Sequence, residues 1–309
     1  MKFLLLLPLF SGATGLSIVD CGACSLAKLT PKDNKDAYFM APPNHFGVFD
    51  GVSQGPESRV FAQTLASEAD AYLSSGAGGV WDTQAPAALL RGTTKAASVS
   101  GMSTALLLKM DLEAQTVCTY NLGDCCCLVV RGGSEVGDIT AVTYHDNGAP
   151  FQLAGGDWIS DDVEDGTAET FNVRSGDVVL CFSDGVTGNL ALNDIAKVVG
   201  GCAGQPAETI AQTVAERARD AELIADDITV LAVRLGGEDG ETAVAPPPAA
   251  QDGEGIKGAI GNFFQKAADA AAEQAKAAAA SAAESAKEAA AAAAKAAADK
   301  AKNAMGKRD

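Results

Sequence analysis

The chain has 309 residues and a mass of 31.3 kDa, which is long enough for one large domain or two small ones. Such a chain can bury a core that needs no disulfide or metal merely to fold. Its formal net charge of −17 argues against nucleic-acid backbones and anionic membrane surfaces as main partners. No apolar stretch reaches the ~20 residues of a transmembrane helix. We therefore expect no transmembrane segment, and we expect a monomer.

The first ten residues combine one early cation, Lys2, with a short apolar run that holds five leucines. Small residues follow up to Gly15. This pattern predicts a secretory signal peptide over residues 1–17, cleaved near Gly15 or Ser17, and the alternative is a buried N-terminal strand. A signal peptide would send the chain into the secretory pathway or an organelle entered through it. A mitochondrial destination is the alternative, although the opening lacks arginines.

Residues 18–236 predict one domain of mixed α and β structure. Helical spacing of apolar side chains covers residues 57–73, 87–99 and 207–223. Strand-like apolar runs cover residues 45–49, 105–110, 116–121, 128–131, 177–183 and 228–235. A Gly123-Asp124 turn separates the third and fourth of these runs, which predicts that they form a hairpin-like pair.

The end of the chain has a different composition. Residues 237–255 are rich in Gly and Pro and predict a linker. In residues 256–309, 25 of 54 positions are alanine, which favours a long helix. The apolar stripe of this tail ends near Phe264, so we expect a solvated, partly frayed helix. The alternative is that the tail is the functional part, as an interaction or spacer segment.

The eight cysteines could pair in a secreted domain. Three of them, at positions 125–127, are consecutive, and we expect buried free thiols there. Cys21 and Cys24 form a C-x-x-C motif without a second pair, which argues against a zinc knuckle. A redox pair or a disulfide between Cys21 and Cys24 is the alternative.

Three aspartates, Asp50, Asp184 and Asp226, each stand at the border of an apolar strand. Two of them are followed by Gly51 and Gly185. Carboxylates at strand ends can converge at one edge of a sheet, where they repel one another unless cations neutralise them. Hard oxygen ligands select Mg²⁺ or Mn²⁺. The alternative for each aspartate taken alone is an ordinary turn residue.

Several blocks follow one another in a characteristic order: Asp36-Ala37-Tyr38-Phe39, Gly47-Val48-Phe49-Asp50-Gly51-Val52, Gly101-Met102-Ser103-Thr104-Ala105, Asn121-Leu122-Gly123-Asp124, Ser183-Asp184-Gly185-Val186 and Asp226-Asp227-Ile228-Thr229-Val230. With these blocks the sequence resembles the metal-dependent serine/threonine protein phosphatases of the type 2C or PPM family, over about residues 36–235. Two further stretches, Leu128-Val129-Val130-Arg131-Gly132-Gly133 and Ala149-Pro150-Phe151-Gln152-Leu153, look like the branch typified by the T-cell activation phosphatase homologue.

The resemblance implies an α+β fold, a four-layer αββα sandwich of two antiparallel sheets flanked by helices, with the metal pair at one end. In this family pattern Asp50 bridges two Mg²⁺ or Mn²⁺ ions and Gly51 lends a backbone carbonyl. Asp184 and Asp226 bind one of the ions. Asp36 binds through water, and Asp124 serves a weaker third ion that some members hold.

The resemblance also implies an activity. It is the hydrolysis of phosphoserine and phosphothreonine monoesters in phosphoprotein substrates by attack of a metal-bound water. Asp50, Asp184 and Asp226 would act through the metals. The alternative is a catalytically weak or inactive phosphatase fold that serves as a regulatory or binding module.

Some positions depart from the family pattern. Many relatives carry a histidine just after the Asp-Gly pair, whereas Val52 and Ser53 follow here, so the general acid is left open. An early arginine that binds phosphate in many members is also missing, and Lys32 and Lys35 are the candidates to replace it. Asp227 takes a place usually held by asparagine. The three consecutive cysteines replace small and polar residues, which could make the site sensitive to oxidation.

Overall fold

The computed structural model describes residues 15–28, 34–41, 44–75 and 84–237. The linker and tail expected after residue 237 lie outside the described residues, as does most of the expected signal peptide. All helices and strands of the described residues belong to one compact unit. Among the described residues, no helix is both long enough and apolar enough to cross a membrane.

Ten strands form two antiparallel five-stranded sheets, with the order β1-β12-β11-β7-β8 in one and β10-β6-β5-β3-β2 in the other. Their bounds are β1 (Leu16–Leu26), β2 (Ala37–Ala41), β3 (His45–Phe49), β5 (Ala105–Asp111), β6 (Thr116–Leu122), β7 (Cys126–Arg131), β8 (Glu135–Ile139), β10 (Thr167–Asn172), β11 (Val178–Phe182) and β12 (Ile228–Gly237). Two short strands, β4 (Met102–Ser103) and β9 (Leu153–Ala154), pair separately.

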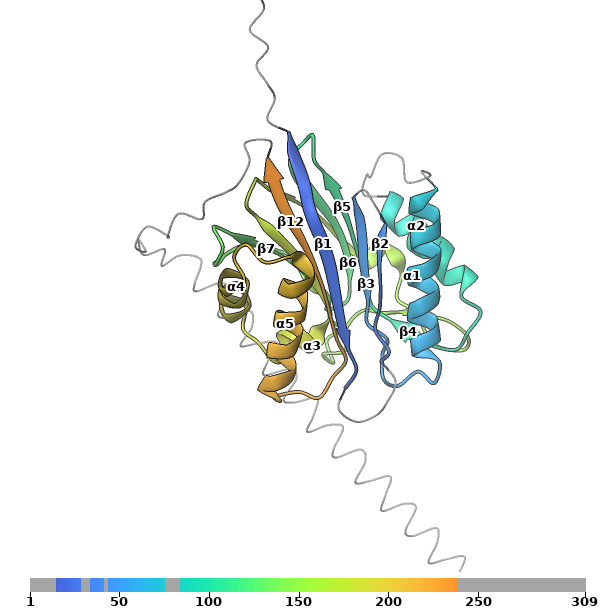
Figure 1. Ribbon diagram of the computed structural model, residues 1–309. Coiled ribbons are helices and arrows are strands. Elements are labelled where there is room, and N and C mark those ends of the chain that lie inside the picture. Colours follow the sequence, from blue (N-terminus) through green and yellow to red (C-terminus); the bar gives the residue numbers. More distant parts are fainter. Residues whose placement is uncertain (1–14, 29–33, 42–43, 76–83, 238–309) are drawn as a thin grey trace, which may run out of the picture. The chain divides into compact units, whose positions relative to one another are not determined.

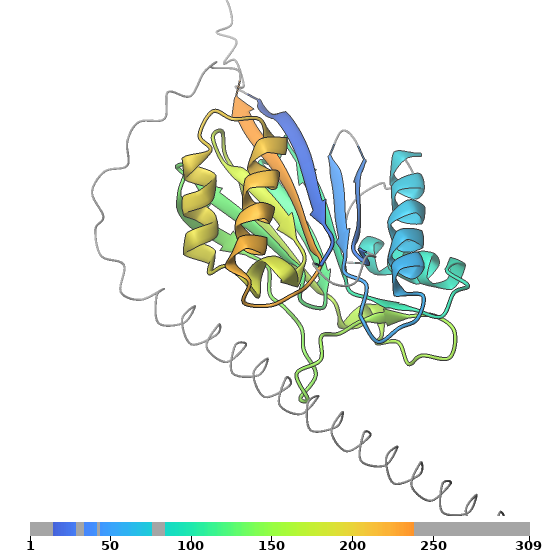
Figure 2. The ribbon, with the colours of Figure 1, turned by 60° about the horizontal axis from the view of Figure 1, so that its bottom comes forward.

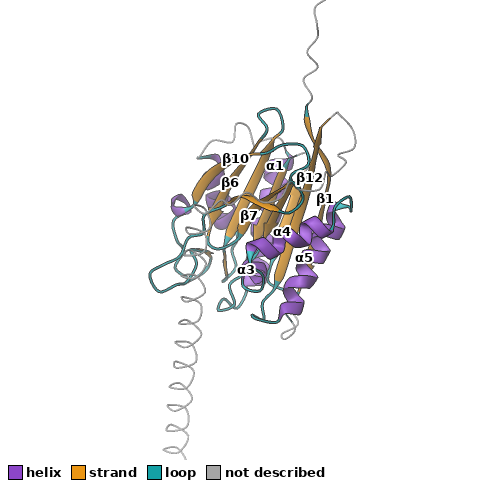
Figure 3. Ribbon diagram, turned by 90° about the vertical axis from the view of Figure 1, so that its left-hand side faces the viewer, coloured by secondary structure: helices purple, strands orange, loops and turns teal. Residues whose placement is uncertain are grey.

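The two sheets pack face to face, and helices cover both outer faces (Figure 1). One group of helices, α1 (Ser58–Ser74) and α2 (Ala85–Ala96), lies beside the sheet that contains β2 and β3. The other group covers the sheet that contains β1 and β12, as the view in Figure 3 shows for α4 and α5. That group consists of α3 (Asp184–Thr187), α4 (Leu192–Gly201) and α5 (Ala207–Ala221). A separate 3-10 helical turn, η1, spans Val163–Asp165. The predicted αββα sandwich is confirmed.

Strand β5 shows why the sequence folds into these layers. Its side chains are buried on both faces, so its sequence is a continuous apolar run rather than an alternating one. Leu106 and Leu108 point into the core between the sheets, where Val129 and Val233 also lie. Leu107, on the other face, belongs to a second core between this sheet and helices α1 and α2.

The predicted hairpin between residues 116–121 and 128–131 is wrong. Strand β6 pairs with β5 and β10 in one sheet, whereas β7 pairs with β11 and β8 in the other. The Gly123-Asp124 turn therefore crosses from one sheet to the other. Gly123 has a φ of +111°, and a Cβ there would come within 2.6 Å of Thr104 Cγ2. Only glycine fits this crossing without strain.

The cysteines follow the expectation of buried free thiols at positions 125–127, which are at most 3% exposed. The alternative pairing of Cys21 with Cys24 does not form in this structure. The two residues are three positions apart on β1, so their side chains lie on opposite faces of the strand. Both thiols are free.

Strand β1 closes one edge of its sheet and packs against α5 (Figure 2). The register against β12 shifts between Ile18 and Asp20, which changes which alternate residues face the helix. Asp20 accepts a hydrogen bond of 2.9 Å from the Ala207 amide at the start of α5. Gly22 then lets the helix approach, because a Cβ at Gly22 would lie 2.3 Å from the Glu208 nitrogen.

We predict that Gly22→Ala lowers the free energy of unfolding by about 1–3 kcal/mol, because the added methyl group forces α5 away from β1. Urea denaturation of the purified protein measures this change. Gly92→Ala is the matched control. Gly92 lies in helix α2 with open space around it, so alanine there should stabilise by roughly 0.5–1 kcal/mol. Equal stabilities for the wild type and the Gly22 variant would contradict the close approach.

Candidate metal centre

Five aspartates stand at strand ends on one side of the sandwich. Asp50 follows β3 directly, Asp36 directly precedes β2, and Asp226 lies two residues before β12. Asp184 is the first residue of α3, and only Ser183 separates it from the end of β11. Asp124 lies in the turn that crosses between the sheets. The antiparallel topology therefore gathers side chains that are up to 190 positions apart in the sequence.

Three of these carboxylates form a tight group. Asp50, Asp124 and Asp184 each offer a carboxylate oxygen, and these oxygens all lie within 4.8 Å of one another. Thr104, the residue directly before β5, holds the backbone of Asp50 through two hydrogen bonds. Its carbonyl accepts a 3.0 Å hydrogen bond from the Thr104 amide, and its amide donates to Thr104 Oγ1 at 3.3 Å. Gly51 is paired with Ser103 in a β-bridge.

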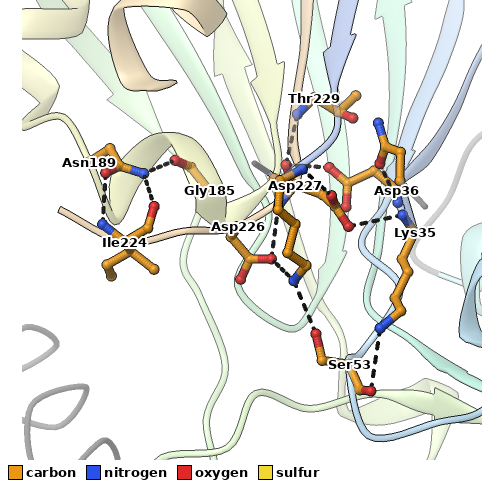
Figure 4. A network of polar contacts seen from close by, with 12 residues as sticks. Lys35, Asp36, Ser53, Gly185, Asn189, Ile224, Asp226, Asp227 and Thr229 are labelled. Atoms are coloured by element: carbon orange, nitrogen blue, oxygen red, sulfur yellow. Dashed lines mark hydrogen bonds and ion pairs between the residues drawn. The ribbon is translucent and has the colours of Figure 1, made fainter. Parts of the chain in front are cut away.

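Asp226 has a different surrounding. Its Oδ1 forms an ion pair with the Lys28 ammonium and accepts a 2.8 Å hydrogen bond from the Asp227 amide. The same ammonium donates to Ser53 Oγ at 3.1 Å. Figure 4 shows Asp226 close to Asp227, with Ser53 below them. The predicted ligand Asp226 thus lies beside the other aspartates but carries a cationic partner of its own.

A network of polar contacts connects the strand ends next to the aspartates, and Figure 4 shows Asp36 and Thr229, which belong to it. Ser183 Oγ donates to Asp36 Oδ2 at 2.7 Å and accepts a 3.0 Å bond from the Thr229 amide. Asn34 Oδ1 accepts a bond of 2.9 Å from the Asp36 amide, and Asn34 Nδ2 donates to Ser25 Oγ at 2.7 Å. These contacts tie the ends of β1, β2, β11 and β12 together.

The carboxylates perturb one another strongly. Burial, together with the charges of Asp36, Asp184 and Asp124, raises the pKa of Asp50 well above its usual range. Burial and the charge of Asp184 do the same to the pKa of Asp124. Burial also raises the pKa of Asp36 to about 7, although the hydrogen bond from Ser183 acts against it.

Lys28 responds in the opposite sense. Burial lowers the pKa of its ammonium, but the hydrogen bond to Asp226 and the charges of Asp226, Asp227 and Asp50 outweigh burial. Its pKa is therefore above the ordinary value, and the side chain stays charged.

The residues fit a divalent cation. The donors are carboxylate oxygens, which Mg²⁺ and Mn²⁺ prefer. Two of them, Asp36 Oδ1 and Asp184 Oδ1, are buried and accept no hydrogen bond within the described part of the chain. A buried carboxylate oxygen without a donor is costly unless a cation satisfies it. Of the predicted converging set Asp50, Asp184 and Asp226, the tight group contains Asp50 and Asp184, and its third member is Asp124 rather than Asp226. The metal-binding roles of these residues and the carbonyl role of Gly51 stay predictions.

Of the two candidates to replace the missing arginine, only Lys35 belongs to the described residues, and its ammonium contacts Ser53 rather than an aspartate. Lys35 Nζ donates to the Ser53 carbonyl at 3.4 Å, and Lys32 lies outside the described residues. The lysine that does contact a predicted ligand is Lys28, which the sequence analysis missed. The contact spans 198 positions and belongs to no motif, so no local signal pointed to it.

The sandwich of two antiparallel sheets, with acidic residues at one end of the strands, defines the PPM-type phosphatase fold. Residues 45–236 match the family described as Stage II sporulation protein E (SpoIIE). This match covers more than half of the chain, and the chain therefore belongs to that family.

Curated relatives are similar in sequence to part of this chain. "Probable protein phosphatase 2C 62" of Arabidopsis thaliana is 29% identical over 192 residues, which are 60% of this chain and 25% of the relative. "Protein phosphatase PTC7 homolog" of Danio rerio is 32% identical over 133 residues, 41% of this chain and 44% of the relative. This chain thus spans less than half the length of either relative.

Solved structures share the fold. The photosystem II phosphatase PBCP has a TM-score of 0.61 at 22% identity, over 71% of this chain and 98% of that one. The catalytic domain of the serine threonine protein phosphatase PstP, solved in complex with two manganese ions, has a TM-score of 0.57 at 17% identity. That alignment covers 72% of this chain and 99% of that one.

The raised pKa values predict how stability depends on pH when metal is removed. Between pH 4 and 7 the folded protein keeps a proton on Asp36, whose pKa is about 7, while the unfolded chain loses it near 3.8. The folded state therefore binds more protons, and the free energy of unfolding should fall as the pH rises through this window. Urea denaturation in EDTA at several pH values measures the slope.

Asp36→Asn is the matched variant for this measurement, because it removes the titrating group and keeps its shape. We expect a shallower slope for the variant than for the wild type. In excess Mn²⁺ the wild type should gain more stability at pH 7 than at pH 5, because the ion binds ionised carboxylates. A metal-free protein that becomes steadily more stable from pH 4.5 to 7 would contradict the assigned shifts.

Proposed function

We propose that this protein is a metal-dependent phosphatase that hydrolyses phosphoserine and phosphothreonine monoesters in protein substrates. The observation that carries the proposal is the group formed by Asp50, Asp124 and Asp184, whose oxygens lie within 4.8 Å of one another at the strand ends. Membership of the SpoIIE family and the phosphatase names of the curated relatives support the same reaction class.

The residues of the chain have distinct tasks in this reaction. Asp50, Asp124 and Asp184 would hold Mg²⁺ or Mn²⁺, and Asp226 and Asp36 extend the ligand set. When bound at such a carboxylate cluster, a pair of divalent ions lowers the pKa of coordinated water and holds the phosphoryl oxygens. The serine of the polar network, Ser183, keeps the Asp36 carboxylate in place by its 2.7 Å hydrogen bond.

The nearby thiols are unsuited to act as nucleophiles. Cys125 lies beside the centre and makes a 3.2 Å contact between its Sγ and Thr104 Oγ1. Burial and the charges of Asp50 and Asp124 raise the pKa of Cys125 well above the ordinary value, so the thiolate is scarce. Burial and the charge of Asp124 also raise the pKa of the Cys126 thiol. Attack by water on phosphorus is therefore the step that this site favours.

We also propose that residues 1–15 act as a leader that directs the chain into the secretory pathway or an organelle entered through it. Strand β1 begins at Leu16, which is buried in the core between the sheets. Cleavage after Gly15 would keep this strand complete, whereas cleavage after Ser17 would remove its first two residues. Amino-terminal sequencing of the mature protein from its own cell tests the site of cleavage.

We predict that Asp50→Asn lowers phosphatase turnover by about 100-fold or more, because the variant loses one charge and one ligand oxygen of the cluster. Hydrolysis of a phosphothreonine peptide in Mn²⁺ measures the loss. The variant should remain folded in EDTA and unfold at an equal or higher urea concentration than the wild type, because the carboxylate repulsion decreases.

Asp194→Asn is the control for this substitution. Asp194 lies on helix α4, is exposed, and pairs only with Lys197 in the structure described. This variant should keep the turnover of the wild type. A folded Asp50→Asn protein with unchanged turnover would refute the proposed reaction, whatever the control shows.

A further inference from the structure

Lys28 lies in an unusual place for a lysine. Its ammonium pairs with Oδ1 of Asp226 and donates to Ser53 Oγ at 3.1 Å. The Lys28 side chain is 10% exposed and that of Asp226 is 30% exposed. A pair so shielded from water interacts more strongly than a surface ion pair of the same geometry.

The backbone holds Lys28 in this position. Asp227 is 2% exposed, and its two carboxylate oxygens accept hydrogen bonds from two different backbone amides. Oδ1 accepts from the Lys28 amide at 2.7 Å, and Oδ2 accepts from the Lys35 amide at 2.9 Å. Asp227 thus clamps both sides of the segment between β1 and β2, as the contact between Lys35 and Asp227 in Figure 4 illustrates. An asparagine at position 227 would offer only one acceptor oxygen.

The result is an uneven charge distribution across the centre. Within the described ranges, Asp226 has a lysine partner, whereas Asp50, Asp124 and Asp184 face one another without an ion pair. The oxygen of Asp226 that Lys28 contacts also accepts the Asp227 amide, so both donors occupy the same atom. A divalent ion that approaches Asp226 therefore meets a fixed positive charge.

We propose that the ammonium of Lys28, whose backbone Asp227 anchors, competes with the divalent ion for the carboxylate of Asp226. The ammonium neutralises Asp226 until the ion arrives, and it leaves the carboxylate when the ion binds. The competition weakens metal affinity at this ligand, so that an ion occupies it only at a higher metal concentration around the protein. This inference rests on the proposed function, because it takes Asp226 to be a metal ligand.

Titration of the full-length protein with Mn²⁺, followed by calorimetry or by the free-ion electron paramagnetic resonance signal, tests the competition without an activity assay. We expect that the Lys28→Met variant binds the Mn²⁺ ion of lowest affinity about tenfold more tightly than the wild type binds it. Lys28→Arg, which keeps the charge, should stay within about threefold of the wild type.

Lys35→Met is the matched control, because Lys35 belongs to the same clamped segment, while its ammonium contacts the Ser53 carbonyl rather than a carboxylate. It removes the same charge without touching Asp226, and we expect its Mn²⁺ affinity to remain near that of the wild type. Equal tightening in both lysine variants would mean a general charge effect and would overturn the competition.

A second measurement follows the ammonium itself. An amine-reactive reagent, with mass spectrometry of the labelled peptides, compares Lys28 with Lys35 in EDTA and in saturating Mn²⁺. Release of Lys28 from Asp226 predicts that labelling of Lys28 rises several-fold with Mn²⁺, while that of Lys35 changes little. Unchanged labelling of Lys28 would overturn the proposal even if Lys28→Met folds poorly.

Two further outcomes separate this proposal from others. If Lys28→Met leaves Mn²⁺ affinity unchanged but weakens binding of inorganic phosphate to the Mn²⁺-loaded protein, Lys28 is a phosphate ligand and the competition is refuted. If the Mn²⁺ affinities shift as expected while no phosphopeptide is hydrolysed, the proposed function fails and the role of Lys28 stands.

Discussion

Mutual repulsion among closely spaced carboxylates is the constraint around which this domain is built. Asp50, Asp124 and Asp184 are held with their oxygens within 4.8 Å of one another, where burial alone already disfavours their charged forms. No folded protein gains stability from such a group by itself. The two sheets must be stable enough to hold the strand ends together, and their core is accordingly continuous and apolar on both faces of β5.

The polar network next to the aspartates turns this repulsion into a defined geometry. Ser183 contacts Asp36 and the Thr229 amide, so one hydroxyl connects the ends of three strands. Asp227 performs a related task by accepting two backbone amides that belong to the segment between β1 and β2. Buried side chains that are fully hydrogen-bonded in this way restrict the aspartates to one arrangement. The positions of the aspartates are thus set by residues outside their tight group.

The layers and most of the aspartates could be predicted from the sequence, because each signal there is local. The apolar run of β5 and the Asp-Gly pair after β3 identify a strand and its end without any knowledge of distant residues. Pairing partners are different. The turn at Gly123 resembles a hairpin turn, but β6 and β7 find their neighbours in β10 and β11, which come later in the chain. Lys28 escaped prediction for the same reason, since its partner Asp226 is 198 positions away.

The pairing of β1 with β12 brings the two described ends of the domain together, because Leu16 lies opposite Gly237. The other end of the same pair, where Leu26 lies opposite Ile228, is next to Asp226 and Lys28. Ten residues of β12 separate the two ends, which corresponds to roughly 30 Å of extended strand. The domain is therefore suited to circular permutation. A short linker from Gly237 to Leu16 would close the chain far from the aspartates, and new termini could be opened in a surface loop without changing which strands pair.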